Sequence, residues 1–264
     1  MTNESGNRSI LRTGLTRRDW LGFAGKGAVG VVVSQALLNC TTNELTAAAT
    51  DSTVTATGAA SGSASCVLTA ALTEGPYFVD EKLLRSDIRT DPVTGAVSQG
   101  VPLSLAFNVS RLANSACTPL TGAYLDVWHC DAGGLYSDES ANGTSGKKYL
   151  RGYQITDANG VASFTTVYPG WYSGRAVHVH FKLRLFAGAT KTYEFTSQFF
   201  FDESLTSSVH AASPYSTRGT RNTVNTMDAI YNSLSATQKS ALTLQAKKTS
   251  DGYSGTITLG VQVG

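Results

Sequence analysis

Near its middle the chain reads Tyr168-Pro169-Gly170-Trp171-Tyr172-Ser173-Gly174-Arg175-Ala176-Val177-His178-Val179-His180, and this stretch leads into a run, 177–186, in which apolar and polar residues alternate. Strict alternation is typical of a half-buried β-strand. His178 and His180 then share one face of that strand, roughly 6–7 Å apart. Because two imidazoles at this spacing can bind the same ion, the stretch predicts a strand and, on it, part of a metal site.

Similar segments lie on both sides of this strand. Alternating or short apolar runs predict further strands at 101–109, 123–129, 150–155, 161–167, 193–201 and 257–263. The turn 157–160, Asp-Ala-Asn-Gly, predicts a hairpin between 150–155 and 161–167. Apolar residues at helical spacing predict a short helix near 222–234. We therefore expect a mainly β fold, a single β-sandwich of antiparallel strands with this short helix, forming one domain over 66–264.

The charge of this domain excludes two classes of partner. The chain has 264 residues and a net charge of +2, but its first forty residues hold five basic and two acidic side chains. The remainder therefore carries 16 basic and 17 acidic side chains. A nearly neutral domain without a basic cluster does not indicate binding to nucleic acid or to an anionic membrane surface.

The N-terminus has the layout of an export signal. Arg17 and Arg18 precede a weakly apolar stretch, 22–38, which is too interrupted to predict a transmembrane helix. This order is typical of a twin-arginine signal over 1–40, although a chance Arg-Arg pair in a tail is the alternative. Leu37-Leu38-Asn39-Cys40 resembles a lipobox, and 41–65 reads as a flexible tether rich in Ala, Thr, Ser and Gly. We expect a periplasmic, extracellular or lipid-anchored protein.

Three cysteines remain in the mature domain. Export to an oxidising compartment makes one disulfide among Cys66, Cys117 and Cys130 plausible. Cys117 and Cys130 flank the predicted strand 123–129, so we favour a bond that involves Cys66. Three buried free thiols are the alternative.

Tyrosines near the His-x-His pair suggest which metal would bind. Tyr136 follows the predicted strand 123–129, and Tyr168 and Tyr172 precede the histidines. A neutral phenol is a poor ligand, but a trivalent cation can displace its proton, and phenolate is a hard donor that favours Fe(III) over zinc or copper. The other two histidines have plainer interpretations: His129 beside Trp128 as a structural residue, and His210 as a solvated residue of a polar loop.

The motifs around these residues resemble one enzyme family. Besides 168–180, they are Thr73-Glu74-Gly75-Pro76-Tyr77-Phe78, Trp128-His129-x-Asp131-x-x-Gly134-x-Tyr136-Ser137 and Leu150-Arg151-Gly152. Together they are similar to the intradiol ring-cleavage dioxygenases, the non-haem Fe(III) enzymes typified by protocatechuate 3,4-dioxygenase and catechol 1,2-dioxygenase. The resemblance covers essentially all of 66–264.

The resemblance implies roles for individual residues. The ligands of one Fe(III) per chain would be Tyr136, Tyr172, His178 and His180. Arg175 would stabilise negative charge on the reacting ring, Gln198 would form a hydrogen bond near the substrate, and Tyr172 would leave the iron and accept a substrate proton. The substrate pocket would be lined by Thr73, Gly75, Pro76 and Tyr77. The substrates would be a catechol and O2, and the ring would open between its two hydroxylated carbons to a cis,cis-muconate-type diacid.

The chain departs from the cytoplasmic catechol enzymes in one respect, because no long helical segment precedes the sandwich. The helical dimer interface of those enzymes is therefore expected to be absent, and we expect a monomer of the exported, single-domain type. Two alternatives remain at this point. One is a zinc hydrolase that uses His178, His180 and either His129 or His210, and the other is a non-catalytic sandwich that binds a glycan or a protein. Metal content (iron, zinc or none) separates the three.

Overall fold

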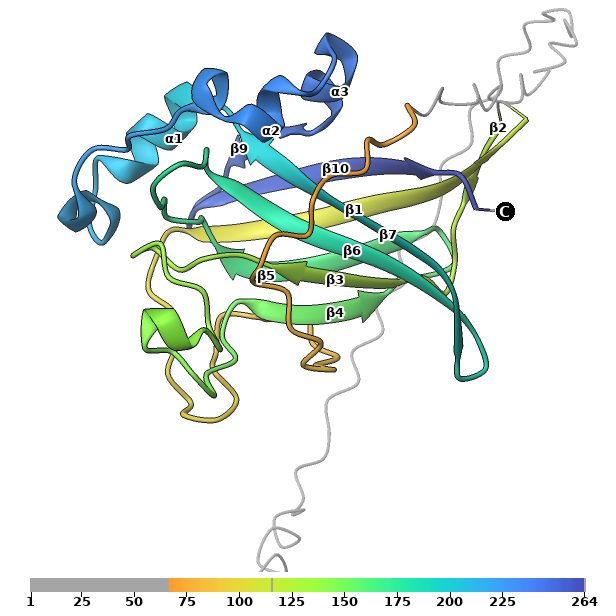
Figure 1. The fold of residues 1–264 in the computed structure, drawn as a ribbon, viewed down its shortest axis with the longest axis horizontal. Helices are drawn as coiled ribbons and strands as arrows, with labels where there is room; N and C mark the ends of the chain where they lie inside the picture. Colours follow the sequence, from red (N-terminus) through yellow and green to blue (C-terminus); the bar gives the residue numbers. More distant parts are fainter. Residues whose placement is uncertain (1–66, 115, 264) are drawn as a thin grey trace, which may run out of the picture. The chain divides into compact units, whose positions relative to one another are not determined.

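The computed structural model describes residues 67–114 and 116–263. The predicted signal, 1–40, and the predicted tether, 41–65, lie outside the described residues, as does Cys66. In the described part, two five-stranded sheets pack face to face, with short helices at one end (Figure 1). The predicted mainly β sandwich is therefore confirmed.

The first sheet is built around one long strand, β1 (Pro102–Ala113). Its other strands are β2 (Ala116–Pro119), β5 (Val161–Val167), β9 (Lys247–Lys248) and β10 (Tyr253–Val261). β10 pairs in parallel with β1 along nearly its whole length, while β5 and β2 pair with successive parts of β1 and so share its other edge. The parallel pair contradicts the prediction that all strands are antiparallel.

The second sheet carries the predicted His-x-His strand at its centre. Its order is β4 (Arg151–Ile155), β3 (Tyr124–Trp128), β6 (His178–Ala187), β7 (Thr190–Phe201) and β8 (Thr243–Leu244). The first three pairs are antiparallel, as predicted, whereas β7 and β8 are parallel. Trp128 of β3 and Gln198 of β7 flank His180 on the two sides.

The predicted turn at 157–160 exists, but it does not close a hairpin. The Asp157 amide donates to the Val161 carbonyl, and the Gly160 amide donates to the Asp157 carbonyl. However, β4 belongs to the second sheet and β5 to the first. The turn therefore carries the chain from one sheet to the other, and the hairpin prediction was wrong.

Large aromatic side chains join the two sheets into one core. The ring of Phe107 on β1 lies 5.7 Å from Phe181 on β6 and 5.9 Å from Phe199 on β7, centroid to centroid. Phe164 on β5 completes the cluster from within the first sheet, 6.0 Å from Phe107. Burying such rings is the main source of stability in a sandwich of this size.

β6 is buried on both faces rather than half-buried, because a segment of irregular chain covers its polar face. Residues 72–85, which we call the strap, cross the outer face of the second sheet (orange in Figure 1). The Leu72 amide donates to Thr196 of β7, and the Arg85 amide donates to Tyr153 of β4. All residues from His178 to Arg184 are buried. Phe181 packs on the first sheet, whereas Lys182 and Arg184 contact Glu74 and Asp80 of the strap. Alternation could not reveal this cover.

The chain on either side of the strap is hydrogen-bonded to the first sheet. Just before it, the Thr69 amide donates to Gly260 of β10. Just after it, Ser86 accepts a hydrogen bond from the Thr165 amide of β5. The chain therefore leaves one sheet, passes over the other and returns to the first.

The helical segments follow β7 and differ from the prediction. α1 (Glu203–His210) was not predicted, and its N-cap is the side chain of Asp202. The single helix predicted near 222–234 is divided into a 3-10 turn, Asn225–Met227, and α2 (Ala229–Asn232), because Asp228 has extended backbone angles between them. The remaining segments are α3 (Ala236–Ala241) and the 3-10 turns Ser140–Asn142 and Tyr215–Arg218. In the described ranges, no helix has the length and apolar character needed to cross a membrane.

The cysteines are not equivalent. Cys117 is disulfide-bonded, whereas Cys130 is a free, buried thiol. The alternative of three free thiols was therefore wrong, and Cys117 and Cys130 do not pair with each other. A bond to Cys66 stays a prediction.

Candidate metal centre

The candidate site lies where the loops after β3 and before β6 meet the start of β6. Asp131 closes the first loop: its side chain accepts from the Leu135 amide at 2.9 Å, and its own amide donates to the Leu135 carbonyl. Gly134 has a φ of +80°, and a Cβ there would collide with the Trp171 carbonyl of the second loop. Only glycine allows this close approach, which brings the loops of Tyr136 and Tyr172 together.

Two imidazole nitrogens and two phenol oxygens converge at this point. Nε2 of His178 lies 3.0 Å from Nε2 of His180, 3.2 Å from the Tyr172 hydroxyl and 3.4 Å from the Tyr136 hydroxyl. Atoms that bind one ion at about 2.0–2.2 Å lie roughly 3–3.5 Å apart, so these separations suit a shared cation. The structure thus brings together all four residues that the sequence singled out as metal ligands.

Burial sets the protonation of these rings. Both histidines are buried, and burial lowers the pKa of His178 to about 3 and the pKa of His180 well below its ordinary value. Burial likewise raises the pKa of Tyr136 well above 10 and that of Tyr172 to about 12, with the nearby charge of Arg175 opposing the second shift. At neutral pH the imidazoles therefore offer lone pairs, and the phenols keep their protons unless a cation displaces them.

The hydrogen bonds of the two histidines fit metal binding. Nδ1 of His178 donates to the Ala176 carbonyl at 2.7 Å, which leaves the lone pair on Nε2, facing the cluster. Nδ1 of His180 is buried and has no hydrogen-bond partner among the described residues. His180 is instead held by its neighbours, above all by the ring of Trp128 stacked on it.

The donor set is unlike a zinc site. In the part of the chain that the structure describes, no three His, Cys, Asp or Glu side chains gather in a way that could hold a metal. His129 is structural, as predicted: it is fully buried, with ring nitrogens 2.8 Å from the Cys130 carbonyl and 2.7 Å from the Thr166 hydroxyl. The cluster therefore offers two nitrogens and two phenol oxygens, which suit a hard cation.

The prediction that His210 is solvated was wrong. His210 ends α1, is 8% exposed and stacks on Tyr215 with ring planes 9° apart. Its Nε2 donates to the Pro169 carbonyl at 3.0 Å. Tyr168 is buried as well, and its hydroxyl lies 2.7 Å from that of Thr206. Both residues help to pack the loop before β6. They are not part of the cluster formed by Tyr136, Tyr172, His178 and His180, which we call the ring cluster.

Arg175 and Gln198 lie beside the cluster and bind each other. Nη2 of Arg175 donates to Oε1 of Gln198 at 2.6 Å, and Nη1 lies 3.5 Å from Nε2 of His178. Sequence reasoning missed a third member, Asp228, whose Oδ2 accepts from Nε of Arg175 at 2.9 Å. Burial alone would raise the pKa of Asp228, but backbone hydrogen bonds and Arg175 outweigh burial and hold the pKa below its ordinary value. The carboxylate is therefore charged at neutral pH.

The strap supplies the other wall of the site. The Thr73 carbonyl accepts from Nε2 of Gln198 at 2.7 Å, and a Cβ on Gly75 would lie 3.5 Å from Cε1 of His180. The ring of Tyr77 stacks on Tyr136 at 4.3 Å. Pro76 lies between Gly75 and Tyr77 in the chain. The stretch predicted to line a substrate pocket thus reaches the ring cluster.

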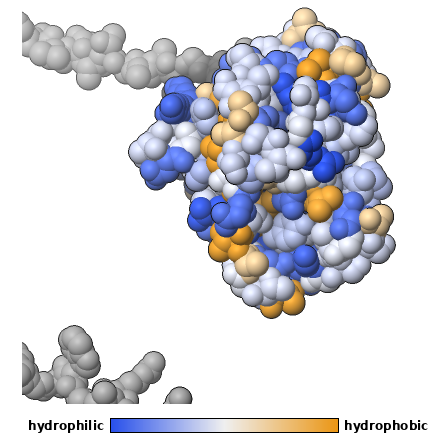
Figure 2. Space-filling model, turned by 90° about the vertical axis from the view of Figure 1, so that its left-hand side faces the viewer, coloured by the Kyte–Doolittle hydropathy of each residue, from blue (hydrophilic) through white to orange (hydrophobic). Residues whose placement is uncertain are grey.

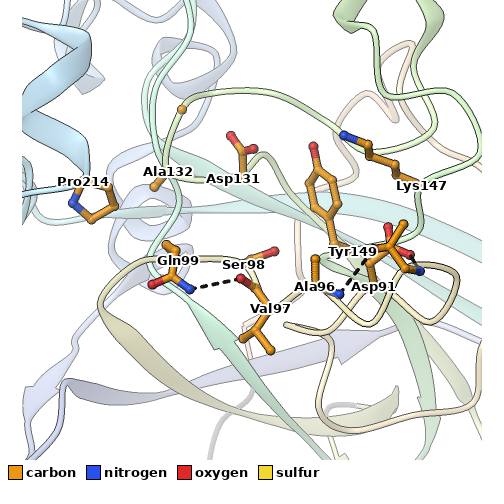
Figure 3. A pocket seen from close by; sticks show the side chains of 12 residues that line it. Asp91, Ala96, Val97, Ser98, Gln99, Asp131, Ala132, Lys147, Tyr149 and Pro214 are labelled. Carbon is orange, nitrogen blue, oxygen red and sulfur yellow. Dashed lines mark hydrogen bonds between the residues drawn. The ribbon is translucent and has the colours of Figure 1, made fainter.

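A separate surface pocket opens near the same loop. It has a volume of about 500 Å3, and its lining includes Asp131, Lys147 and Tyr149 but none of the four ring residues. Figure 3 shows these three side chains pointing to the same side of the pocket.

Figure 2 shows the end of the sandwich where α1 lies, with hydrophobic residues in small, separated patches. This face of the molecule carries no continuous apolar surface.

Comparisons with known proteins agree with this geometry. The model of a family described as Dioxygenase matches residues 73–228, more than half of the chain. No curated protein sequence matches. Among solved structures, the chain is similar to an intradiol ring-cleavage dioxygenase from Tetranychus urticae, at 27% identity over 75% of this chain and 95% of that one, with a TM-score of 0.64.

Two bacterial structures extend the comparison. The dioxygenase domain of a dioxygenase and carbohydrate-binding protein fusion from Streptomyces sp. SirexAA-E is 27% identical over 75% of this chain and 100% of that one, with a TM-score of 0.53. A hydroxyquinol 1,2-dioxygenase from Pseudomonas putida DLL-E4 shares the fold, at 17% identity over 75% and 67% of the chains and a TM-score of 0.51. With the family match over the residues that form the ring cluster, the chain belongs to the intradiol ring-cleavage dioxygenases and is an oxidoreductase.

Proposed function

We propose that this enzyme binds one ferric ion through Tyr136, Tyr172, His178 and His180 and uses it to cleave a catechol with O2. The observation that carries the proposal is that Nε2 of His180 and the hydroxyls of Tyr172 and Tyr136 lie 3.0–3.4 Å from Nε2 of His178. Two phenols and two neutral imidazoles match the preference of Fe(III) for hard oxygen and imidazole donors. When bound, Fe(III) would supply Lewis acidity, which polarises both catechol oxygens and activates the ring toward O2.

The two tyrosines have different environments and, we propose, different roles. Tyr136 is 1% exposed and is stacked against Tyr77, so it has no room to move. Tyr172 is only partly buried. With a pKa of about 12, its phenolate is a strong base once formed. Tyr172 would therefore swing away when the substrate arrives and accept one proton from a catechol hydroxyl, while Tyr136 stays in place.

Arg175 and Gln198 would act on the ring of the substrate. The guanidinium is fixed within 3.5 Å of Nε2 of His178, so a positive charge faces the place where negative charge develops during ring attack. Gln198 is fully buried and is held between Arg175 and the Thr73 carbonyl. Its amide keeps the guanidinium and the strap in register. The ring would open between its two hydroxylated carbons to a cis,cis-muconate-type diacid.

A visible absorption spectrum tests this function. We expect a protein with one iron per chain and a charge-transfer band that moves to longer wavelength when catechol is added without O2. Tyr172→Phe should shift and weaken the band, and His178→Ala should remove it together with most of the iron. As a control, Tyr124→Phe, on the far part of β3, should leave the band unchanged. A colourless protein after reconstitution with Fe(III), or zinc at one equivalent, would contradict the proposal.

We further propose that the enzyme acts outside the cytoplasm as a monomer. The support for export is the Arg17-Arg18 signal pattern, the lipobox-like Cys40 and the Ala/Thr/Ser/Gly-rich tether, all read from the sequence. Replacing both arginines by lysine should retain the precursor in the cytoplasm. Sedimentation of the exported enzyme should give one species near the mass of one chain, and a concentration-dependent dimer would contradict the monomer.

A further inference from the structure

Asp228 is a charged side chain shut away from solvent beside the proposed iron site. It is 0% exposed, and its carboxylate accepts four hydrogen bonds. Oδ1 accepts from the amides of Ile230 and Tyr231 at 2.8 and 2.9 Å, which caps α2. Oδ2 accepts from the Ala176 amide at 2.8 Å and from Nε of Arg175 at 2.9 Å. Every contact of this carboxylate is with a donor, so its position is fully determined.

The guanidinium of Arg175 is clamped as a result. Its Nε is bound to Asp228, and its Nη2 is bound to Gln198. A planar guanidinium with two edges held can present its third nitrogen in one direction only. That nitrogen, Nη1, is the one that lies 3.5 Å from Nε2 of His178. The orientation of Arg175 therefore depends on a residue that lies 53 positions away in the sequence.

Asp228 itself has no room to approach the reacting atoms. Its oxygens are occupied by the helix amides on one side and by Ala176 and Arg175 on the other. Any influence on the reaction must therefore pass through Arg175.

We propose that Asp228 is a positioning residue, which aims Arg175 at the substrate and couples the start of α2 to the site. This inference rests on the function proposed above, in which Arg175 acts on the substrate ring. Both carboxylate oxygens of Asp228 are needed as hydrogen-bond acceptors. In either orientation, the NH2 group of an asparagine would point at two N–H donors. If its oxygen kept the cap of α2, the NH2 group would face the Ala176 amide and Nε of Arg175.

The test is Asp228→Asn in the iron-loaded, full-length enzyme. We expect iron content and the charge-transfer band to equal those of the wild type, while kcat falls about 10- to 100-fold, as for other misaligned catalytic groups. KM should change much less. The matched control is Asp202→Asn, since Asp202 caps α1 through the Leu205 amide at 2.9 Å but is exposed, and its side chain accepts only from Leu205 and Ser204 among the described residues. Its kcat should be that of the wild type.

A double variant separates positioning from general damage. In an Arg175→Met background, Asp228→Asn should change kcat by less than about 2-fold, because its effect is already lost. If instead the fold-losses of kcat caused by the two substitutions multiply, the proposal is overturned. It is also overturned if Asp228→Asn alone keeps the wild-type kcat.

Two further outcomes remain informative. If Asp228→Asn does not fold, Asp228→Glu replaces it, since glutamate keeps the charge but moves the carboxylate; we expect a smaller loss of kcat, and an unchanged kcat would overturn the proposal. If the wild-type enzyme itself lacks iron and ring-cleaving activity, the proposed function fails, and the inference fails with it. If the wild-type enzyme binds iron and cleaves catechol but Asp228→Asn keeps the wild-type kcat, only this inference fails and the proposed function stands.

Discussion

The indole of Trp128 and the imidazole of His180 lie face to face, with ring centroids 4.9 Å apart and planes 6° from parallel. The other cluster histidine, His178, is oriented by a hydrogen bond from Nδ1 to the Ala176 carbonyl. Since Nδ1 of His180 finds no such partner among the described residues, the stack with Trp128 does for His180 what a hydrogen bond does for His178.

Replacing this indole should therefore weaken metal binding as well as the fold. We expect Trp128→Leu to lower the free energy of unfolding by about 2–4 kcal/mol and to weaken iron binding by about tenfold. Thermal unfolding and competition with a chelator measure the two effects. Phe164→Leu, in the core between the sheets, is the control: it should lower stability but leave iron affinity unchanged. Equal iron affinity in both variants would show that the stack does not orient His180.

Substitution of Gly75 should affect substrate binding as well as stability, because Gly75 faces His180. Its φ is +69°, so alanine there should cost about 1 kcal/mol of stability. Gly95 has a φ of +74° with nothing near its Cβ position, and Gly95→Ala should cost about the same. Only Gly75→Ala should raise KM for catechol, because strain there displaces the strap that faces His180. If the two variants had the same KM, the strap would not line the substrate pocket.

The stability of the protein should fall in acid partly because of His129. Burial lowers its pKa to about 4 from an ordinary value of 6.5. Between these values the unfolded chain binds more protons than the folded one, so the free energy of unfolding decreases as the pH falls from 6.5 toward 4. From pH 7.5 to pH 5, His129 should account for a loss of about 2 kcal/mol. Urea denaturation at both pH values should show a smaller loss in His129→Gln, and an equal loss would refute the assignment.

Lys182 should contribute more than a surface lysine of the same sheet. It is buried between Glu74 of the strap and Glu194 of β7, and its Nζ lies 3.6 Å from the ring centroid of Phe78. We expect Lys182→Met to lower stability by about 1–2 kcal/mol and to raise KM, since Glu74 is part of the strap. Lys191, which also pairs with Glu194 but is exposed, is the control: Lys191→Met should change stability by less than about 0.5 kcal/mol. Urea denaturation and steady-state kinetics distinguish the two.

The local features of the chain could be predicted from sequence, because they depend on periodicity and spacing. Alternation over 177–186 identified β6, and the i, i+2 spacing of His178 and His180 placed both rings on one face. Helical spacing also located the segment around α2, although it could not show that Asp228 interrupts it.

The long-range features could not be predicted, since alternation says which face a residue occupies but not which strand lies beside it. β1 and β10 pair in parallel across most of the chain, and nothing near either strand signals this. The turn at 157–160 has the residues of a hairpin, yet its two strands pair with β3 and β1, in different sheets. Asp228 was missed for the same reason, because its partner Arg175 is 53 residues away.

The strap makes the second sheet a clasped layer, with the first sheet on one side and residues 72–85 on the other. The ends of the strap are hydrogen-bonded to the second sheet, and the residues just outside it, Thr69 and Ser86, are hydrogen-bonded to Gly260 and Thr165 of the first sheet. An ion bound at His178 and His180 would have the strap as one wall, since a Cβ on Gly75 would lie 3.5 Å from Cε1 of His180. The bonds of the ion to its ligands would have to break within this wall, so a variant that loosens the strap should release iron faster than the wild type.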